Sequence, residues 1–146
     1  MPRKLTPSLK ELPALEMTRT AIGDQKLVYV LLTDKAFEYP HGGKSCVAYI
    51  GTTKNGIARL AGSAAAKATE TLGWHGVKTV MARVVTCRPR RRIKTWKKLE
   101  RVMLLEFRAQ FGRVPLCNSQ GARIVEEDEY SYFSRDAIRR LILSLG

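Results

Sequence analysis

Residues 26–51 read KLVYVLLTDKAFEYPHGGKSCVAYIG, and this stretch decides the fold. Its two ends, residues 26–32 and 46–51, are rich in β-branched and aromatic residues, which favour strands. Residues 33–45 between them contain the glycine, proline and polar residues typical of a loop. We therefore expect an antiparallel hairpin. Residues 14–22 form a further, weaker extended segment before a turn at Gly23 and Asp24.

The residues after this hairpin alternate between helical and extended patterns. Apolar residues recur at helical spacing over residues 56–72, and residues 78–87 form a β-branched run that ends before Pro89. A second helix is expected from residue 94 or 95 to 111, with Gly112 at its end, and a third follows a Ser134 cap. The predicted fold is α+β, a small, mainly antiparallel three-stranded sheet flanked by helices.

The length of 146 residues fits one folded domain. Residues 1–14 carry three prolines among polar residues and predict a flexible arm, followed by a single domain over residues 15–146. Three widely spaced cysteines without a CxxC pair argue against a disulfide framework and a zinc knuckle. No apolar run is long enough for a membrane span or a signal peptide, so we expect a cytoplasmic protein without a membrane partner.

The charge of the chain is strongly positive. Its 26 Lys and Arg against 13 Asp and Glu give a formal net charge of +13, which favours a nucleic-acid partner because neutralised phosphates release counterions. Solubility alone, ribosomal binding or a membrane surface are the alternatives. An acidic run at residues 126–129 is expected to be solvated, or else to fold against the basic face.

A basic run precedes and enters the second helix. Residues 88–101, RPRRRIKTWKKLER, contain eight Lys or Arg at a predicted strand-to-helix junction, where side chains can reach consecutive phosphates. A solvated face is the alternative to a phosphate-binding one. The predicted nucleic-acid-binding residues are Arg88, Arg90, Arg91, Arg92, Lys94, Lys97 and Lys98.

One carboxylate on the second helix is out of place. The apolar stripe of this helix consists of Trp96, Leu99, Met103, Phe107 and Phe111. Glu100 falls within that stripe, and a buried carboxylate must be paired or bind a metal. A salt bridge to an arginine is the alternative. Glu106 lies at the edge of the stripe, where we expect an exposed residue.

These motifs together resemble the GIY-YIG nuclease family. Tyr49-Ile50-Gly51 matches the YIG element, and Leu27-Val28-Tyr29 stands in place of the GIY element, with its Tyr but without its Gly. Arg59 follows YIG at the family's interval, Glu100 lies on a later helix, and Pro115-Leu116-Cys117-Asn118 matches the terminal Pro-x-x-Asn. The resemblance spans residues 27–118.

The resemblance implies a metal-dependent endonuclease that hydrolyses phosphodiester bonds in DNA, including branched or nicked forms. The implied catalytic residues are Tyr29, Tyr49, Arg59, Glu100 and Asn118. Glu100 would hold one Mg²⁺ or Mn²⁺ at the scissile phosphate, with Glu106 in reserve because its interval to Asn118 is nearer to that of many relatives. Arg59 would pair with the phosphate.

The resemblance also implies roles for the tyrosines and the asparagine. Tyr49 would help remove a proton from the attacking water, and Tyr29 would hold Tyr49 and that water. Positive charge from Arg59 and the metal would favour the tyrosinate. Asn118 would brace the site through hydrogen bonds.

Two other functional classes remain open from the sequence. The first is a non-catalytic DNA- or RNA-binding module that retains the fold, and the second is an interaction protein whose charge serves a larger assembly. The sequence does not reveal the oligomeric state or the DNA target.

Overall fold

The computed structural model describes residues 3–14, 16, 18, 22–74, 76–119 and 123–146. Its sheet contains β1 (Leu27–Glu38), β2 (Lys44–Thr53) and β3 (Val80–Val85), all antiparallel, in the order β2-β1-β3. The helices are α1 (Gly56–Leu72), α2 (Thr95–Phe111) and α3 (Arg135–Leu145), with a short 3-10 turn at Glu129–Ser131. The predicted α+β class and three-stranded antiparallel sheet are confirmed.

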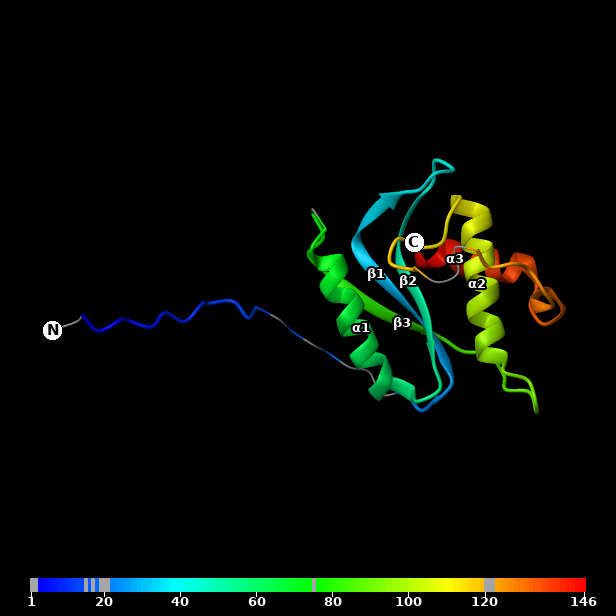
Figure 1. The fold of residues 1–146 in the computed structure, drawn as a ribbon, viewed down its shortest axis with the longest axis horizontal. Coiled ribbons are helices and arrows are strands. Elements are labelled where there is room, and N and C mark those ends of the chain that lie inside the picture. Colours follow the sequence, from blue (N-terminus) through cyan, green and yellow to red (C-terminus); the bar gives the residue numbers. More distant parts are fainter. Residues whose placement is uncertain (1–2, 15, 17, 19–21, 75, 120–122) are drawn as a thin grey trace.

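The sheet separates two layers of helices. Helix α1 lies on one side, and α2 and α3 lie on the other (Figure 1). The central strand β1 is therefore buried on both faces. Leu27, Tyr29 and Leu31 pack on the α1 side of β1. The alternate residues Val28, Val30 and Leu32 belong to the larger core with α2 and α3. This continuous burial explains why residues 27–32 are almost uniformly apolar.

The β1–β2 hairpin is longer than the sequence predicted. Residues 33–38, expected in a loop, continue β1, and Phe37 and Glu38 pair with Ser45 and Lys44. The pairing is irregular between Leu31 and Phe37, so the strand does not show the simple alternation that marks a regular strand. Its tight connection contains Gly42, whose φ of 86° suits glycine.

The helices agree closely with the sequence pattern. Helix α1 has the predicted bounds, and α2 ends before Gly112, whose φ of 88° is the left-handed conformation common after a helix. The Ser134 hydroxyl accepts a hydrogen bond from the Ala137 amide at 3.4 Å, as expected for a cap. None of the helices within the described ranges is long and apolar enough to cross a membrane.

The N-terminal segment extends away from the folded body (Figure 1). Residues 3–14 are exposed and belong to no helix or strand. The strand expected at residues 14–22 lies in part outside the described residues, and the described positions 14, 16, 18 and 22 are not in a strand.

Candidate active site

The candidate site begins with two tyrosines on neighbouring strands. Tyr29 on β1 pairs with Gly51, and Tyr49 on β2 pairs with Leu31, so the tyrosines are diagonal neighbours across the hairpin. Their ring centroids are 5.8 Å apart, with an angle of 42° between the planes. Tyr29 is buried and Tyr49 is partly exposed. The strand pairing thus brings the two predicted tyrosines together.

Gly51 is required for this arrangement. A Cβ atom at position 51 would lie 2.5 Å from Tyr49 Cε1 and 2.8 Å from the Tyr29 hydroxyl. Such distances are too short for any side chain unless a ring moves. The glycine after Tyr49-Ile50 therefore has a packing function, which is to leave space for both rings.

Asn118 closes the free edge of β2. Its Oδ1 accepts a hydrogen bond from the Ile50 amide at 3.0 Å, and its Nδ2 donates to the Ile50 carbonyl at 2.9 Å. The Cys117 amide donates to the Ala48 carbonyl at 2.9 Å beside it. These bonds satisfy backbone groups that an edge strand would otherwise leave without partners. They also fix the backbone on either side of Tyr49, which is the bracing position expected for Asn118.

A pocket of about 510 Å³ lies at this edge, between α1 and α2. Tyr49, Asn118 and Glu100 line it together with Lys67 of α1 and Arg101 of α2. The pocket therefore unites Tyr49, Glu100 and Asn118, which lie far apart in the sequence. Tyr29 reaches the site through its contact with Tyr49.

Glu100 is the carboxylate of this pocket. It is partly buried and has no hydrogen bond or ion pair to another residue in the described part of the chain. Burial raises its pKa above the ordinary value, and the charges of Lys97 and Arg101 oppose that rise without cancelling it. The salt bridge that the sequence left as an alternative for Glu100 does not form with a described residue.

Arg101 stands next to Glu100 but is bound elsewhere. Its Nε donates to Glu129 Oε1 at 2.5 Å, and its Nη2 donates to the Val125 carbonyl at 2.7 Å and lies 3.6 Å from Glu127 Oε1. Glu129 is fully buried, so this pair is part of the interior. Three acceptors therefore hold the guanidinium, which explains why Glu100 remains without a partner.

The acidic run was expected either to be solvated or to fold against the basic face. Its ion pairs with Lys98 and Arg101 match the second alternative, and for the buried Glu129 solvation is wrong. Desolvation raises the pKa of Glu129, but the hydrogen bonds from Arg101 and the Glu127 amide outweigh it, so the net shift is downward. Asp128 pairs with Lys98 at 2.6 Å. The carboxylates of Glu127, Asp128 and Glu129 lie close enough to share a cation, yet each already has a basic partner. These three carboxylates therefore neutralise Lys98 and Arg101 of α2.

The surroundings that the chain itself provides favour the protonated form of Tyr49. Burial, followed by the nearby Tyr29 and Glu100, raises the pKa of Tyr49 above its ordinary value. The ammonium of Lys67 lies 5.1 Å from the Tyr49 ring centroid. Its charge does not reverse the shift, so the phenol keeps its proton at neutral pH.

Two basic residues of α1, Arg59 and Lys67, differ in their position relative to the pocket. Arg59 is exposed in the first turn of the helix and does not line the pocket. Lys67 does line it, and its Nζ donates to the Cys117 carbonyl at 3.2 Å and lies 3.9 Å from Glu70. Lys67 is not among the site residues expected from the sequence. The available signal was a single lysine in the run AAAKA, facing an edge strand that carries Tyr49.

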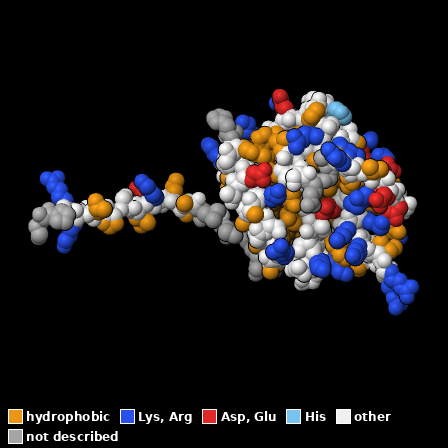
Figure 2. All heavy atoms as spheres, in the orientation of Figure 1, with side chains coloured by type: hydrophobic (Ala, Val, Ile, Leu, Met, Phe, Trp, Pro, Cys, Tyr) orange, Lys and Arg blue, Asp and Glu red, His pale blue; other side chains and the backbone are white. Residues whose placement is uncertain are grey.

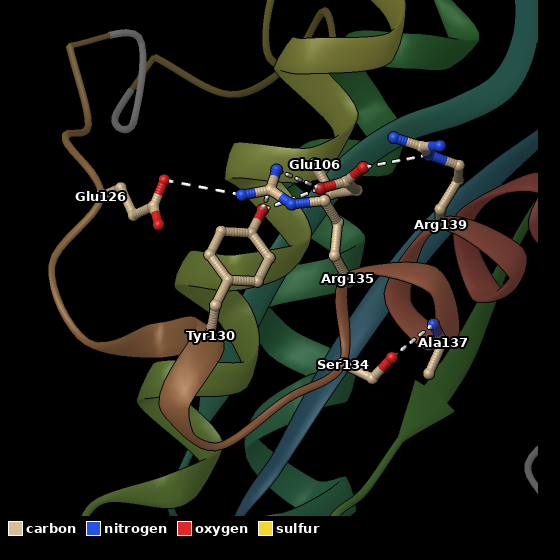
Figure 3. A network of polar contacts seen from close by, with 7 residues as sticks. All are labelled: Glu106, Glu126, Tyr130, Ser134, Arg135, Ala137 and Arg139. Atoms are coloured by element: carbon tan, nitrogen blue, oxygen red, sulfur yellow. Dashed lines mark hydrogen bonds and ion pairs between the residues drawn. The ribbon is translucent and has the colours of Figure 1, made fainter.

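Glu106, the reserve metal ligand, was expected to be exposed, and that expectation is wrong. Only 1% of its surface is exposed, because α3 and the segment before it cover this side of α2. It accepts hydrogen bonds from the Tyr130 hydroxyl at 2.7 Å, Arg135 Nη1 at 3.3 Å and Arg139 Nε at 3.3 Å (Figure 3). The carboxylate is already satisfied by two arginines, so it is a structural residue here.

The predicted basic residues differ in their surroundings. Lys98 is engaged with Asp128, and Arg90 lies 5.6 Å from the Tyr132 ring centroid. The other predicted residues are exposed and have no ion pair to a described residue; they are Arg88, Arg91, Arg92, Lys94 and Lys97.

The site therefore combines a tyrosine pair, an asparagine that holds the strand edge, a carboxylate without a partner and a lysine around one pocket. The lining of the pocket mixes polar and apolar side chains, and Lys67, Arg101 and Arg123 bring positive charge to it. No family model, no curated protein and no solved structure matches this chain.

Proposed function

We propose that this chain is a metal-dependent endonuclease that hydrolyses phosphodiester bonds in DNA, with a site of the GIY-YIG kind. The observation that carries the proposal is the position of Glu100: its carboxylate has no partner among the described residues and lines one pocket with Tyr49 and Asn118. A carboxylate that forms no ion pair with a described residue, in a protein of net charge +13, calls for a functional explanation.

The pocket fits a hard divalent cation such as Mg²⁺ or Mn²⁺. Mg²⁺ is usually held by one or two carboxylates together with water and substrate phosphate oxygens, so the single Glu100 is a sufficient protein ligand. Such a cation, when bound, stabilises negative charge that develops on phosphoryl oxygens. Glu106 and the run Glu127–Glu129 are weaker candidates, because arginines or lysines already neutralise them.

The remaining residues of the site have roles that follow from their contacts. Lys67 supplies positive charge inside the pocket and would bind a non-bridging phosphate oxygen. Arg59, exposed at the start of α1, would contact the DNA strand outside the pocket. Asn118 positions the backbone that carries Tyr49 through its two bonds to Ile50.

The raised pKa of Tyr49 refines its proposed role. A protonated phenol donates a hydrogen bond, so in the resting site Tyr49 would orient a phosphate oxygen or a water molecule. Tyr29 would hold the Tyr49 ring in place through their contact. Proton removal by Tyr49 would require additional positive charge beside it.

A non-catalytic nucleic-acid-binding module is the second candidate. One observation favours it: Arg59, the residue expected to pair with the phosphate, lies outside the pocket. Both candidates share the basic surface, so binding alone does not separate them.

The test measures cleavage of plain, nicked and branched duplex DNA with Mg²⁺ or Mn²⁺ and with chelator. We expect metal-dependent cutting of at least one substrate that Glu100→Gln abolishes. The matched control is Glu38→Gln, a glutamate in the hairpin with 80% of its side chain exposed. Mn²⁺ binding, measured by electron paramagnetic resonance, should likewise be lost only in Glu100→Gln.

The outcomes separate the two candidates. Cutting that disappears with chelator and with Glu100→Gln, but not with Glu38→Gln, supports the nuclease. Binding without cutting of any substrate, unchanged by Glu100→Gln, would leave the non-catalytic module. Cutting retained in Glu100→Gln would remove Glu100 from the proposed mechanism.

A further inference from the structure

A short arginine-rich turn projects from the body next to the candidate site. It comprises Arg90–Ile93, which we call the arginine turn, and it leads directly into α2. Figure 1 shows the connection between β3 and α2 extending beyond the end of α2, and Figure 2 shows Lys and Arg spheres projecting from the same corner. In this view the basic corner projects beyond the rounded outline of the body.

The arginine turn has a defined shape. Arg90 and Ile93 form an antiparallel bridge, and the Ile93 amide donates to the Arg90 carbonyl at 3.3 Å. The Arg90 guanidinium lies 5.6 Å from the Tyr132 ring centroid, which ties the base of the turn to the segment before α3. The two residues at the tip, Arg91 and Arg92, are exposed and have no ion pair to a described residue.

The tip also stores backbone strain. Arg92 has a φ of 63°, and it is the one non-glycine residue with a positive φ in the described part of the chain. Glycine or asparagine is the usual choice for this conformation, because an L side chain there is strained. Glycine at position 92 would adopt this φ without strain, so the presence of an arginine there indicates that its guanidinium makes a functional contact.

The arginine turn contrasts with the other arginines of this region. Arg101, Arg135 and Arg139 are engaged by buried carboxylates and contribute to the interior. Arg91 and Arg92 contribute no such contact. Their side chains are exposed to solvent.

We infer that the arginine turn docks in the major groove of the DNA duplex whose strand enters the candidate site, with Arg91 and Arg92 as its contacting side chains. The inference rests on the proposed function for the identity of the site beside it. A two-stranded turn with its side chains is roughly 10 Å wide, which matches the ~12 Å major groove and exceeds the ~6 Å minor groove. Guanidinium groups at its tip match guanine O6 and N7 or flanking phosphates.

The spacing allows one duplex to reach both sites. Glu100 follows Lys94 by six residues, a rise of roughly 9 Å along α2. The turn is therefore on the order of 10–20 Å from the pocket, less than the ~34 Å of one DNA helical turn. Docking would thus fix the position of the cut relative to the groove contact.

The test measures Kd for a plain 30-base-pair duplex and for a single strand over a range of KCl concentrations. We expect Arg91→Ala/Arg92→Gly to weaken duplex binding by about 10- to 100-fold and to reduce the salt slope by about two. Glycine at position 92 keeps the backbone conformation, so the loss reports the guanidinium. Its removal of strain should also raise Tm by about 2 °C.

The matched control removes two charges elsewhere. Arg83→Ala/Arg140→Ala changes exposed arginines on β3 and α3 and leaves the turn intact. An equal loss of affinity in this control would overturn the inference, because the effect would then be net charge alone. Equal losses on duplex and single strand, or competition by the minor-groove ligand netropsin without competition by the major-groove ligand methyl green, would also overturn it.

Cleavage measurements separate this inference from the proposed function. If the protein binds duplex through Arg91 and Arg92 but cuts no DNA, the arginine turn stands and the nuclease proposal fails. If the protein cuts DNA and the turn variant has unchanged Kd, the inference fails and the nuclease proposal stands. If both hold, the turn variant should regain a near-normal single-turnover rate when the enzyme is saturating.

Discussion

Replacement of each α2 carboxylate by its uncharged isostere should shift stability in opposite directions. Glu106→Gln removes a buried charge that accepts from Tyr130, Arg135 and Arg139. The side-chain oxygen of the glutamine can still accept a hydrogen bond from one of these donors. Its NH2 group cannot accept, so it faces the other donors without forming hydrogen bonds with them. Glu100→Gln instead removes a charge that burial disfavours and that no described residue pairs with.

The size of each effect follows from the contacts. Hydrogen bonds to charged groups contribute roughly 1.5–3 kcal/mol each. The side chains of Arg135 and Arg139 are 48% and 50% exposed, so water recovers part of the loss. We expect Glu106→Gln to cost about 2–3 kcal/mol, below the upper range for a broken buried pair. Glu100→Gln should gain up to about 1 kcal/mol, as is common where a functional group is kept against stability.

The assay is urea unfolding at pH 7 with chelator, analysed for both midpoint and slope. Glu38→Gln is the control and should change the free energy of unfolding by less than about 0.5 kcal/mol. A Glu106→Gln loss below about 0.5 kcal/mol would refute the proposed contribution of the arginine network. A Glu100→Gln loss above about 1 kcal/mol would show that Glu100 has a stabilising partner, and would refute our account of the pocket.

Three further predictions concern the tyrosine pair, the pocket lysine and acid stability. Gly51→Ala should destabilise the protein by about 1–3 kcal/mol, because the added methyl group collides with both tyrosine rings. Gly62→Ala, in open space on α1, should instead stabilise it by about 0.5–1 kcal/mol. Thermal unfolding of both variants checks this, and equal shifts in Tm would contradict it. Lys67→Met keeps an unbranched aliphatic side chain but removes the ammonium that lies over the Tyr49 ring, so it should lower kcat/KM for DNA cutting at least about tenfold. A steady-state rate within twofold of wild type would exclude Lys67 from phosphate binding. Because the pKa of Glu129 is lowered in the folded state, the unfolded state binds more protons as the pH falls. The contribution of Glu129 to the free energy of unfolding is therefore present above the ordinary pKa of 4.5 and is lost as pH falls through the lower folded value. Glu129→Gln should make the free energy of unfolding, measured with urea, depend less steeply on pH on the acid side, and an unchanged dependence would contradict this assignment.

Local patterns predicted the elements of this fold well, because each pattern was strong within a single segment. The helical spacing gave the bounds of α1, and Gly112 marked the end of α2. The extension of β1 through residues 33–38 was missed, because the irregular pairing with β2 removes the alternation that would reveal it. Residues 33–38 are extended because β1 pairs with β2 here, and not because their own sequence favours a strand.

The candidate site was predictable in part. The family resemblance singled out Tyr29, Tyr49 and Asn118, and the structure places them together at the edge of β2. The burial of Glu106 was not predictable from the α2 pattern, because Arg135 and Arg139 lie 29 and 33 residues further along the chain. Periodicity describes one helix, whereas the partners of a charge depend on which elements pack against it.

The assignment of arginines to glutamates decides which carboxylate on α2 can hold a cation. Glu106 is neutralised by α3, and Arg101, which follows Glu100 in α2 and lines the same pocket, is taken by the buried Glu129. The segment around Glu129 thus acts on the pocket through Arg101, since it keeps that guanidinium away from the neighbouring carboxylate. If Glu129 were removed, Arg101 would be released to pair with Glu100. We therefore expect Glu129→Gln to weaken Mn²⁺ binding at the pocket although residue 129 does not line it, and unchanged Mn²⁺ affinity would mean that Arg101 does not reach Glu100.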